Sequence, residues 1–250
     1  MEDLDAFVEE LLNGLVALPE EKMRLDLLGR RLGAIDPEDA ARCLDEIYRA
    51  GANRKSRIAR ATLIDHDGLK EAIGKGAYRQ ISEAAIRLGF GKVSRLFSDL
   101  LPVKAGLSGY DKEEEAAMEF ISLGRRRSLA RSRIKDTIDR LLSDPDPVVV
   151  ANLLNNPRIT EKEVLKIASK RPGSPAILKL IVSHRVWSKR YDVIKAVAMN
   201  PYASPKVSVA LLEFLMTQDL KVLSEDRNVH PALRLGAKEL LAQRGAGERH

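Results

Sequence analysis

The chain has 250 residues, of which 44% are hydrophobic, 31% are charged and 4% are aromatic, and its formal net charge is +6. This composition is typical of a folded helical protein, and no apolar run approaches the roughly 20 residues that span a bilayer. A single cysteine, Cys43, excludes an intrachain disulfide and a cysteine-rich metal site. Because the N-terminus is acidic, unlike a signal peptide, the sequence predicts a cytoplasmic protein with no membrane span.

The charge is distributed unevenly along the chain. Residues 1–125 carry 19 Lys and Arg against 23 Asp and Glu, a net charge of −4. Residues 126–250 carry 23 against 13, a net charge of +10. A basic half of this kind is suited to an acidic protein, a nucleic acid or a membrane surface.

Helix signals follow one another through the first half of the chain, whereas strand signals are nearly absent. Within residues 36–51, Asp36 is a candidate N-cap, Pro37 suits the first helical position and Gly51 suits the stop. Apolar residues recur at helical spacing near the N-terminus, at Leu4, Phe7, Val8, Leu11, Leu12 and Leu15. Further helices are expected at about residues 20–33, 53–64, 67–74, 78–88, 91–100 and 111–123.

The segment LPVKAGLSGYDKEEE, residues 101–115, indicates a boundary. It contains two glycines and a proline, followed by an acidic run, and such composition is typical of connections between structural units. We expect an N-terminal helical region over residues 1–110, a helical-repeat region over 111–245 and a disordered tail over 246–250.

A proline corner recurs in the second half. A shift of 44 residues aligns two copies, with Asn156, Pro157 and Thr160 in the first and Asn200, Pro201, Ser204 and Pro205 in the second. Proline ends the preceding helix because the residue before it avoids the α conformation, and a Thr or Ser shortly afterwards suits the next N-cap. These residues are therefore expected to be architectural: each unit is a helix, a corner and a helix, whose apolar faces need neighbours.

The stretch DPDPVVVANLLNNPRITEKEVLKIASKRP resembles the leucine-rich-repeat variant family and, more loosely, HEAT-like arrays. The likeness covers about residues 143–172 and 192–215. It implies an all-α fold in which stacked helical hairpins form a right-handed α-solenoid. Founding members of the family carry a cysteine-rich iron–sulfur segment, which a chain with Cys43 alone does not match, so no cofactor is expected. Residues 81–97, ISEAAIRLGFGKVSRLF, resemble a segment of the HDOD domain, a helical bundle of bacterial signalling.

The strongest local charge feature is GRRRSLARSRIK, residues 124–135. Its candidate contacts for phosphate or acidic side chains are Arg125, Arg126, Arg127, Arg131 and Arg133. Ser128 is a candidate N-cap, which would leave the first three arginines in an exposed corner. The alternative is a solvated corner paired with the acidic run DKEEE. Because stacking aromatics are missing from this stretch, sequence-specific nucleic-acid recognition is disfavoured.

A second candidate is HRVWSKRY, residues 184–191, where the only tryptophan, Trp187, lies beside Arg185, Lys189 and Arg190. Tryptophan among arginines is typical of protein interface hot spots. The alternative is a tryptophan that fills the gap between repeat layers.

No catalytic or metal-binding constellation emerges. His66 lies between two aspartates, but the other histidines occur singly, so Asp67 is expected to cap a helix that begins at Leu69. We therefore expect no enzymatic activity and no metal. The sequence favours a protein-interaction scaffold or regulatory adaptor that presents a basic helical-repeat surface to an acidic protein partner. The alternatives are a helical-repeat protein that binds nucleic acid without sequence specificity and, less favoured, a HEAT-like DNA glycosylase.

Overall fold

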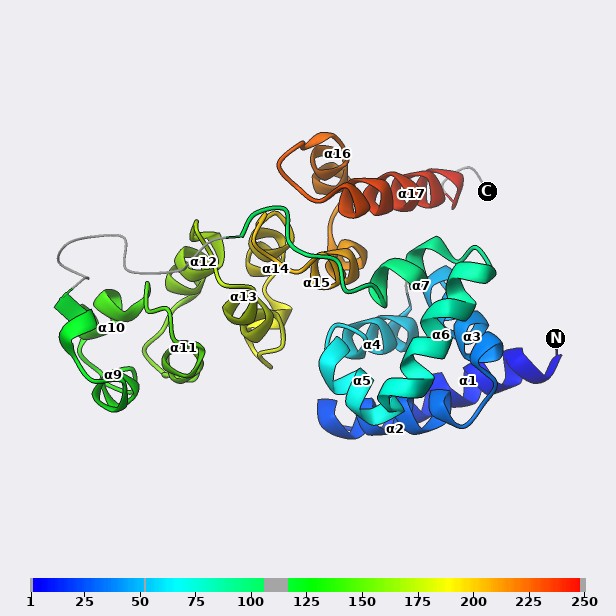
Figure 1. Ribbon diagram of the computed structural model, residues 1–250, viewed down its shortest axis with the longest axis horizontal. Helices are drawn as coiled ribbons and strands as arrows, with labels where there is room; N and C mark the ends of the chain where they lie inside the picture. Colours follow the sequence, from blue (N-terminus) through cyan, green and yellow to red (C-terminus); the bar gives the residue numbers. More distant parts are fainter. Residues whose placement is uncertain (1, 52, 106–116, 248–250) are drawn as a thin grey trace. The chain divides into compact units, whose positions relative to one another are not determined.

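The computed structural model describes residues 2–51, 53–105 and 117–247, and within these ranges it contains helices and no strand, which confirms the all-α class. The chain divides into two compact units, Met1–Leu100 (unit 1) and Leu101–His250 (unit 2) (Figure 1). The division falls before the expected boundary at residue 110. The reason is that the segment after Leu100 already runs with unit 2, where the Lys104 N–H donates to the Pro201 carbonyl at 3.2 Å.

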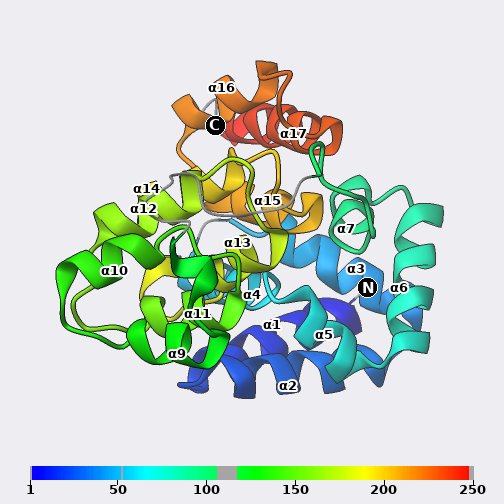
Figure 2. The same ribbon diagram turned by 60° about the vertical axis from the view of Figure 1, so that its left-hand side comes forward.

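Unit 1 contains seven helices among its described residues. They are α1 (Glu2–Ala17), α2 (Glu21–Gly33), α3 (Pro37–Arg49), α4 (Arg54–Thr62), α5 (His66–Ile73), α6 (Lys75–Arg87) and α7 (Gly91–Leu96). In this unit α2 packs on α5, α3 on α6 and α1 on α4 (Figure 2). The leucines at helical spacing in α1 and α2 form the core, since Leu11, Leu15 and Leu28 are almost completely buried.

Of two helix starts predicted in unit 1, that of α3 is confirmed and that of α5 is wrong. Asp36 caps α3 as expected, and its Oδ1 accepts the Glu38 N–H at 2.8 Å. The start of α5 was predicted wrongly, because the helix begins at His66 and not at Leu69. Asp65 is the N-cap: its backbone is not helical and its Oδ1 accepts the Gly68 N–H at 3.3 Å, whereas Asp67 already lies inside the helix.

A close approach between α2 and α5 depends on Gly29. A Cβ atom at this position would lie 2.8 Å from the carbonyl carbon of Ala72, closer than real Cβ contacts allow. Because backbone cannot move away as a flexible side chain can, glycine is what permits the two helices to pack at this distance.

We predict that Gly29→Ala lowers the free energy of unfolding by about 1–3 kcal/mol through overpacking, a change that chemical denaturation measures. Gly51→Ala is the matched control, since a Cβ there meets nothing within 4 Å. Equal unfolding free energies for the two variants would contradict the assignment of this contact.

Unit 2 is a succession of short helices. They are η1 (Ala117–Phe120), α9 (Leu123–Leu129), α10 (Lys135–Leu141), α11 (Pro147–Leu154), α12 (Glu161–Ser169), α13 (Pro175–Val182), η2 (Trp187–Lys189), α14 (Tyr191–Ala198), α15 (Pro205–Leu211), η3 (Leu212–Phe214), α16 (Thr217–Glu225) and α17 (Pro231–Gly247). Helix α11 packs on α9 and α13, α15 packs on α17, and α12 packs on α14 (Figure 1). We call α9, α11, α13, α15 and α17 the odd helices and α10, α12, α14 and α16 the even helices.

Two expectations for unit 2 need correction at its ends. The helix expected over residues 111–123 is not continuous in its described part, where the 3₁₀ turn η1 is followed by a separate helix that begins at Leu123; residues 111–116 lie outside the described residues. Residues 246 and 247 of the expected tail belong to α17, which continues to Gly247; residues 248–250 lie outside the described residues.

Proline begins four of the odd helices. Pro147, Pro175, Pro205 and Pro231 each stand at the start of an odd helix, 28, 30 and 26 residues apart. Proline suits this position because the first N–H of a helix has no intrahelical partner. These prolines recur at every second helix. The 44-residue shift instead aligns α11 with α14 and α12 with α15, so that it pairs an odd helix with an even one.

The two asparagines of the aligned corners are buried and make equivalent hydrogen bonds. The Asn156 Nδ2 donates to the carbonyls of Ala130 and Ser132 at 2.8 and 2.7 Å. The Asn200 Nδ2 donates to the carbonyls of Ala168 and Lys170 at 2.8 and 3.2 Å. In both residues Oδ1 accepts the N–H two residues later. Each asparagine therefore closes its own turn through its Oδ1. Through its Nδ2 it also donates to two carbonyls of another corner that lies earlier in the chain.

We predict that Asn200→Ala lowers the free energy of unfolding by about 2–3 kcal/mol, because it leaves two buried carbonyls without their donor. Asn200→Asp should be at least as damaging in chemical denaturation at neutral pH, since a carboxylate cannot donate to those carbonyls. Asn228→Ala, at an exposed position where the amide donates to the Asp226 Oδ1 at 3.0 Å, should cost less than about 1 kcal/mol. A loss at Asn200 as small as that at Asn228 would refute the structural role.

Candidate functional site

Three corners that lead from an odd helix to the next even helix lie together in unit 2. They comprise residues 130–134, 155–160 and 183–190. Asn156 hydrogen-bonds the first corner, as described above. The third corner contacts the second through the His184 Nε2, 3.3 Å from the Asn155 Oδ1, and the indole N–H of Trp187 donates to the Leu154 carbonyl at 3.0 Å. Direct hydrogen bonds thus fix the three corners side by side.

These corners carry basic side chains and no carboxylate. Their exposed basic residues, which we call the basic edge, are Arg131, Arg133, Arg158, Arg185, Lys189 and Arg190. The sequences of the three corners, ARSRI, NNPRIT and SHRVWSKR, contain no Asp or Glu. The structure therefore brings together five of the residues predicted as partner contacts, and it adds Arg158.

Two members of the basic edge have partners within unit 2. The guanidinium of Arg131 donates to the Asn152 Oδ1 at 3.2 and 3.4 Å. The Arg190 Nε lies 3.7 Å from the Glu161 Oε2, in an exposed pair that contributes little stability. Within the described part of the chain, Arg133, Arg158 and Arg185 form no ion pair. These three arginines have their charge available to a partner.

Arg126 and Arg127 are not part of the basic edge. Helix α9 covers Leu123–Leu129 with Ser122 before it, so Ser128 is not an N-cap and the arginines lie inside the helix. The Arg126 Nε is 3.4 Å from a carboxylate oxygen of Asp144, and the side chains of this pair are only 13% and 0% exposed. An Arg127 nitrogen lies 3.5 Å from the Asp146 Oδ2.

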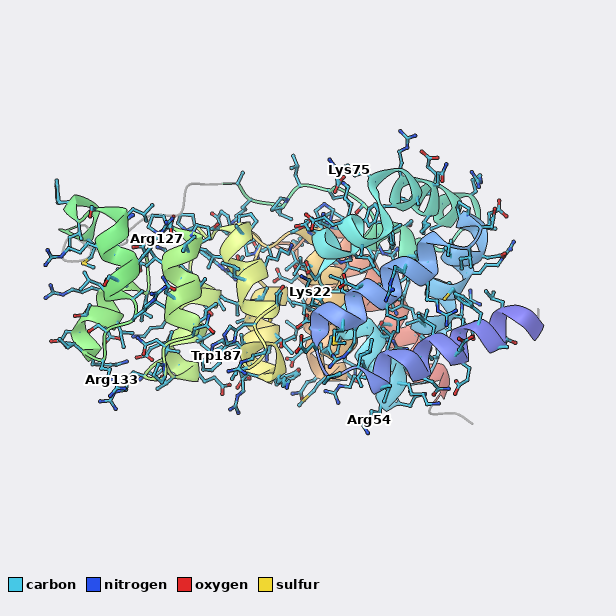
Figure 3. The ribbon with its side chains drawn as sticks, turned by 90° about the horizontal axis from the view of Figure 1, so that it is seen from below. Lys22, Arg54, Lys75, Arg127, Arg133 and Trp187 are labelled. Atoms are coloured by element: carbon cyan, nitrogen blue, oxygen red, sulfur yellow. The ribbon has the colours of Figure 1, made fainter. Side chains whose placement is uncertain are left out.

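Figure 3 shows Arg127 and Arg133 at opposite edges of unit 2, with Trp187 toward the side of Arg133. The pairing with Asp144 and Asp146 removes Arg126 and Arg127 from the predicted partner contacts. Arg125 is exposed on α9, outside the basic edge. The acidic run DKEEE, named as the alternative partner of these arginines, lies outside the described residues.

Trp187 is a core residue and not an exposed contact. Its side chain is 8% exposed, and its indole N–H bonds the end of α11. The His184 ring stacks beside it at 6.2 Å between centroids. Burial of this ring corrects the expectation of a tryptophan hot spot. The cations of its segment, Arg185, Lys189 and Arg190, are exposed.

Two lysines of the even helices pair with carboxylates of the next even helix. Lys135 of α10 pairs with Glu163 of α12, and the Lys195 Nζ of α14 lies 2.7 Å from the Asp219 Oδ1 of α16. Burial raises the pKa of Asp219, but hydrogen bonds from Lys195 and Tyr191 outweigh it and hold that pKa below its usual value. These two lysines thus link helices within unit 2.

The sequence contained a signal for Arg158 that the motif comparison did not use. Arg158 follows Asn156-Pro157 directly, inside a corner judged architectural. A search for charge at equivalent corners, instead of charge in continuous runs, would have included it.

The described residues also bear on metal binding and on membrane insertion. Among them, no three His, Cys, Asp or Glu side chains come close enough together to hold a metal ion. The helices in those ranges include none that combines the length and the apolarity needed to cross a membrane. No protein-family model matches the chain, and comparisons with curated proteins and with solved structures give no match either.

We predict that acid weakens unit 2 through His184. Burial, and then the charge of Arg185, lower the pKa of His184 below 6.5, and its Nδ1 accepts the Val186 N–H. Because the unfolded chain takes up the proton first, the stabilisation is complete above about pH 6.5 and is lost as the pH falls toward the lowered pKa. Denaturation between about pH 7 and pH 5 should show a smaller loss for His184→Gln than for the wild type.

His230 accounts for a remaining slope in the variant, since burial lowers its pKa as well. Identical pH profiles for the wild type and His184→Gln would show that His184 is not a source of acid sensitivity.

Proposed function

We propose that this chain is a non-enzymatic interaction scaffold of the cytoplasm, whose second unit is a right-handed α-solenoid related to leucine-rich-repeat variant and HEAT-like arrays. Its basic edge binds an acidic protein partner. The packing of α11 on α9 and α13, the packing of α12 on α14 and the prolines that begin four odd helices support the solenoid assignment. The observation that carries the binding assignment is the set of six exposed basic side chains on three hydrogen-bonded corners without a carboxylate.

The composition of the basic edge favours carboxylates as ligands. Five of its six residues are arginines, and the planar guanidinium presents paired N–H donors that match a carboxylate. Three corners fixed by Asn156, His184 and Trp187 hold these donors on ordered backbone. A partner therefore meets a preorganised row of cations, which reduces the entropy lost on binding.

A nucleic acid is the competing ligand for the same cations. Binding to single strands generally adds base stacking on aromatic side chains, which contributes about 1–3 kcal/mol per base. In the segment of the basic edge the aromatic ring is that of Trp187, and it is buried. This burial is the reason for preferring a protein ligand.

Charge reversal tests the basic edge. We predict that Arg133→Glu, Arg158→Glu and Arg185→Glu together weaken binding to the partner at least about tenfold, or about 1.4 kcal/mol. Affinity purification with quantitative mass spectrometry, after nuclease treatment, should recover an acidic protein with the wild type and lose it with this variant. Titration calorimetry with the purified partner then gives the ratio of the dissociation constants.

The matched control is Lys221→Glu, Arg227→Glu and Lys238→Glu, three exposed positions around α16 and α17. This control changes the net charge by the same amount and should retain the partner. If both triple variants lose it equally, the effect is overall charge and not the basic edge. If nuclease abolishes recovery, or the wild type binds a duplex at low salt with a steep salt dependence, the nucleic-acid function replaces this proposal.

A further inference from the structure

Unit 1 contains a cavity of about 520 Å³ where α5 meets α6. This volume is within the usual range of small-molecule sites, about 300–1,000 Å³. Its lining residues are Lys70, Lys75, Gly76, Tyr78, Arg79, Ser82, Phe97 and Asp99. The cavity belongs to unit 1 alone, so its function is independent of the basic edge.

A glycine turn brings its cations together. Gly74 alone separates α5 from α6, its φ of +87° is in the region that favours glycine, and its N–H donates to the Lys70 carbonyl at 3.1 Å. The last turn of α5 therefore meets the first turn of α6. Lys70 comes from the last turn of α5, Lys75 is the first residue of α6 (Figure 3), and Arg79 follows one turn later.

The floor of the cavity is aromatic and uncharged. Tyr78 and Phe97 are each 4% exposed, and their ring centroids are 4.5 Å apart. The Lys70 Nζ lies 5.5 Å from the centroid of the Tyr78 ring. Burial, followed by the charges of Asp99 and Asp67, raises the pKa of Tyr78, so its phenol remains neutral. The charge in the cavity thus comes from the residues on its walls.

Positive charge dominates these walls. The lining includes three cations and one carboxylate, Asp99, which lies 3.7 Å from the Lys70 Nζ. Arg79 also pairs with Glu83 at 3.6 Å, an exposed pair that a stronger anion can displace. Gly74 has no side chain to cap α6, so the first N–H groups of this helix of 13 residues add positive potential beside Lys75 and Gly76.

We propose that this cavity binds a small phosphate monoester of about mononucleotide size. A phosphate dianion suits several cations at once better than a single carboxylate does. The cavity is larger than inorganic phosphate, which leaves room for the esterified body against Tyr78 and Phe97. The phosphate is the recognised group, and the body adds contact with the floor.

The test is titration calorimetry of the full chain with adenosine 5′-monophosphate, ribose 5-phosphate and adenosine as probes. Both phosphate esters should bind saturably, inorganic phosphate should compete with them, and adenosine should not bind. Lys75→Glu with Arg79→Glu should weaken binding of the monophosphate at least about tenfold. Gly76→Trp should do the same without a change of charge, because a side chain at this open position enters the cavity.

The matched control is Lys22→Glu with Arg54→Glu, which makes the same charge change at exposed positions of unit 1 outside the lining (Figure 3). Its affinity should stay within about twofold of the wild type. No saturable binding of either ester would overturn the proposal. So would adenosine binding as tightly as its monophosphate, or equal losses in the two charge-reversal variants. Circular dichroism of each variant confirms that a loss of binding is not a loss of folding.

Discussion

Carbonyl oxygens at the ends of short helices have no intrahelical donor. In unit 2, two buried asparagine side chains satisfy four carbonyls at or just beyond such ends. Helices α9 to α15 have only seven to nine residues each, fewer than an isolated helix needs for stability in water. Their stability therefore depends on neighbours. Asn156 and Asn200 link neighbouring corners. Each side-chain amide donates to two carbonyls of another corner and accepts one N–H of its own corner.

In unit 1 an arginine, and not an asparagine, satisfies carbonyls at a helix end. The guanidinium of Arg60 on α4 is 7% exposed and donates to the carbonyls of Ile47 and Tyr48 at 3.1 and 3.2 Å, at the end of α3. A buried cation that bonds backbone carbonyls at a helix C-terminus stabilises that end through both its hydrogen bonds and the helix dipole. In both units, therefore, polar side chains that a composition count would assign to the surface are part of the core.

The sequence predicted the helices well because their signals are local. Asp36 and Pro37 start α3, and the leucine spacing of α1 places its buried face without any tertiary information. The residues of the candidate site were harder to predict from the sequence. Arg126 and Arg133 look alike in a basic run, yet one faces the buried Asp144 and the other faces solvent.

What separates them is the position of the corner between α9 and α10, which depends on packing against α11 and not on residue type. The conspicuous Asn-Pro pair recurs after 44 residues, whereas the prolines that begin α11, α13, α15 and α17 recur at every second helix.

Three of the corner hydrogen bonds share a direction along the chain. Asn156, Trp187 and Asn200 each donate to a carbonyl that precedes them, from 26 to 33 residues earlier. During synthesis on the ribosome, each of these carbonyls therefore emerges before its donor. It is hydrated by water until the segment that carries the donor has left the exit tunnel.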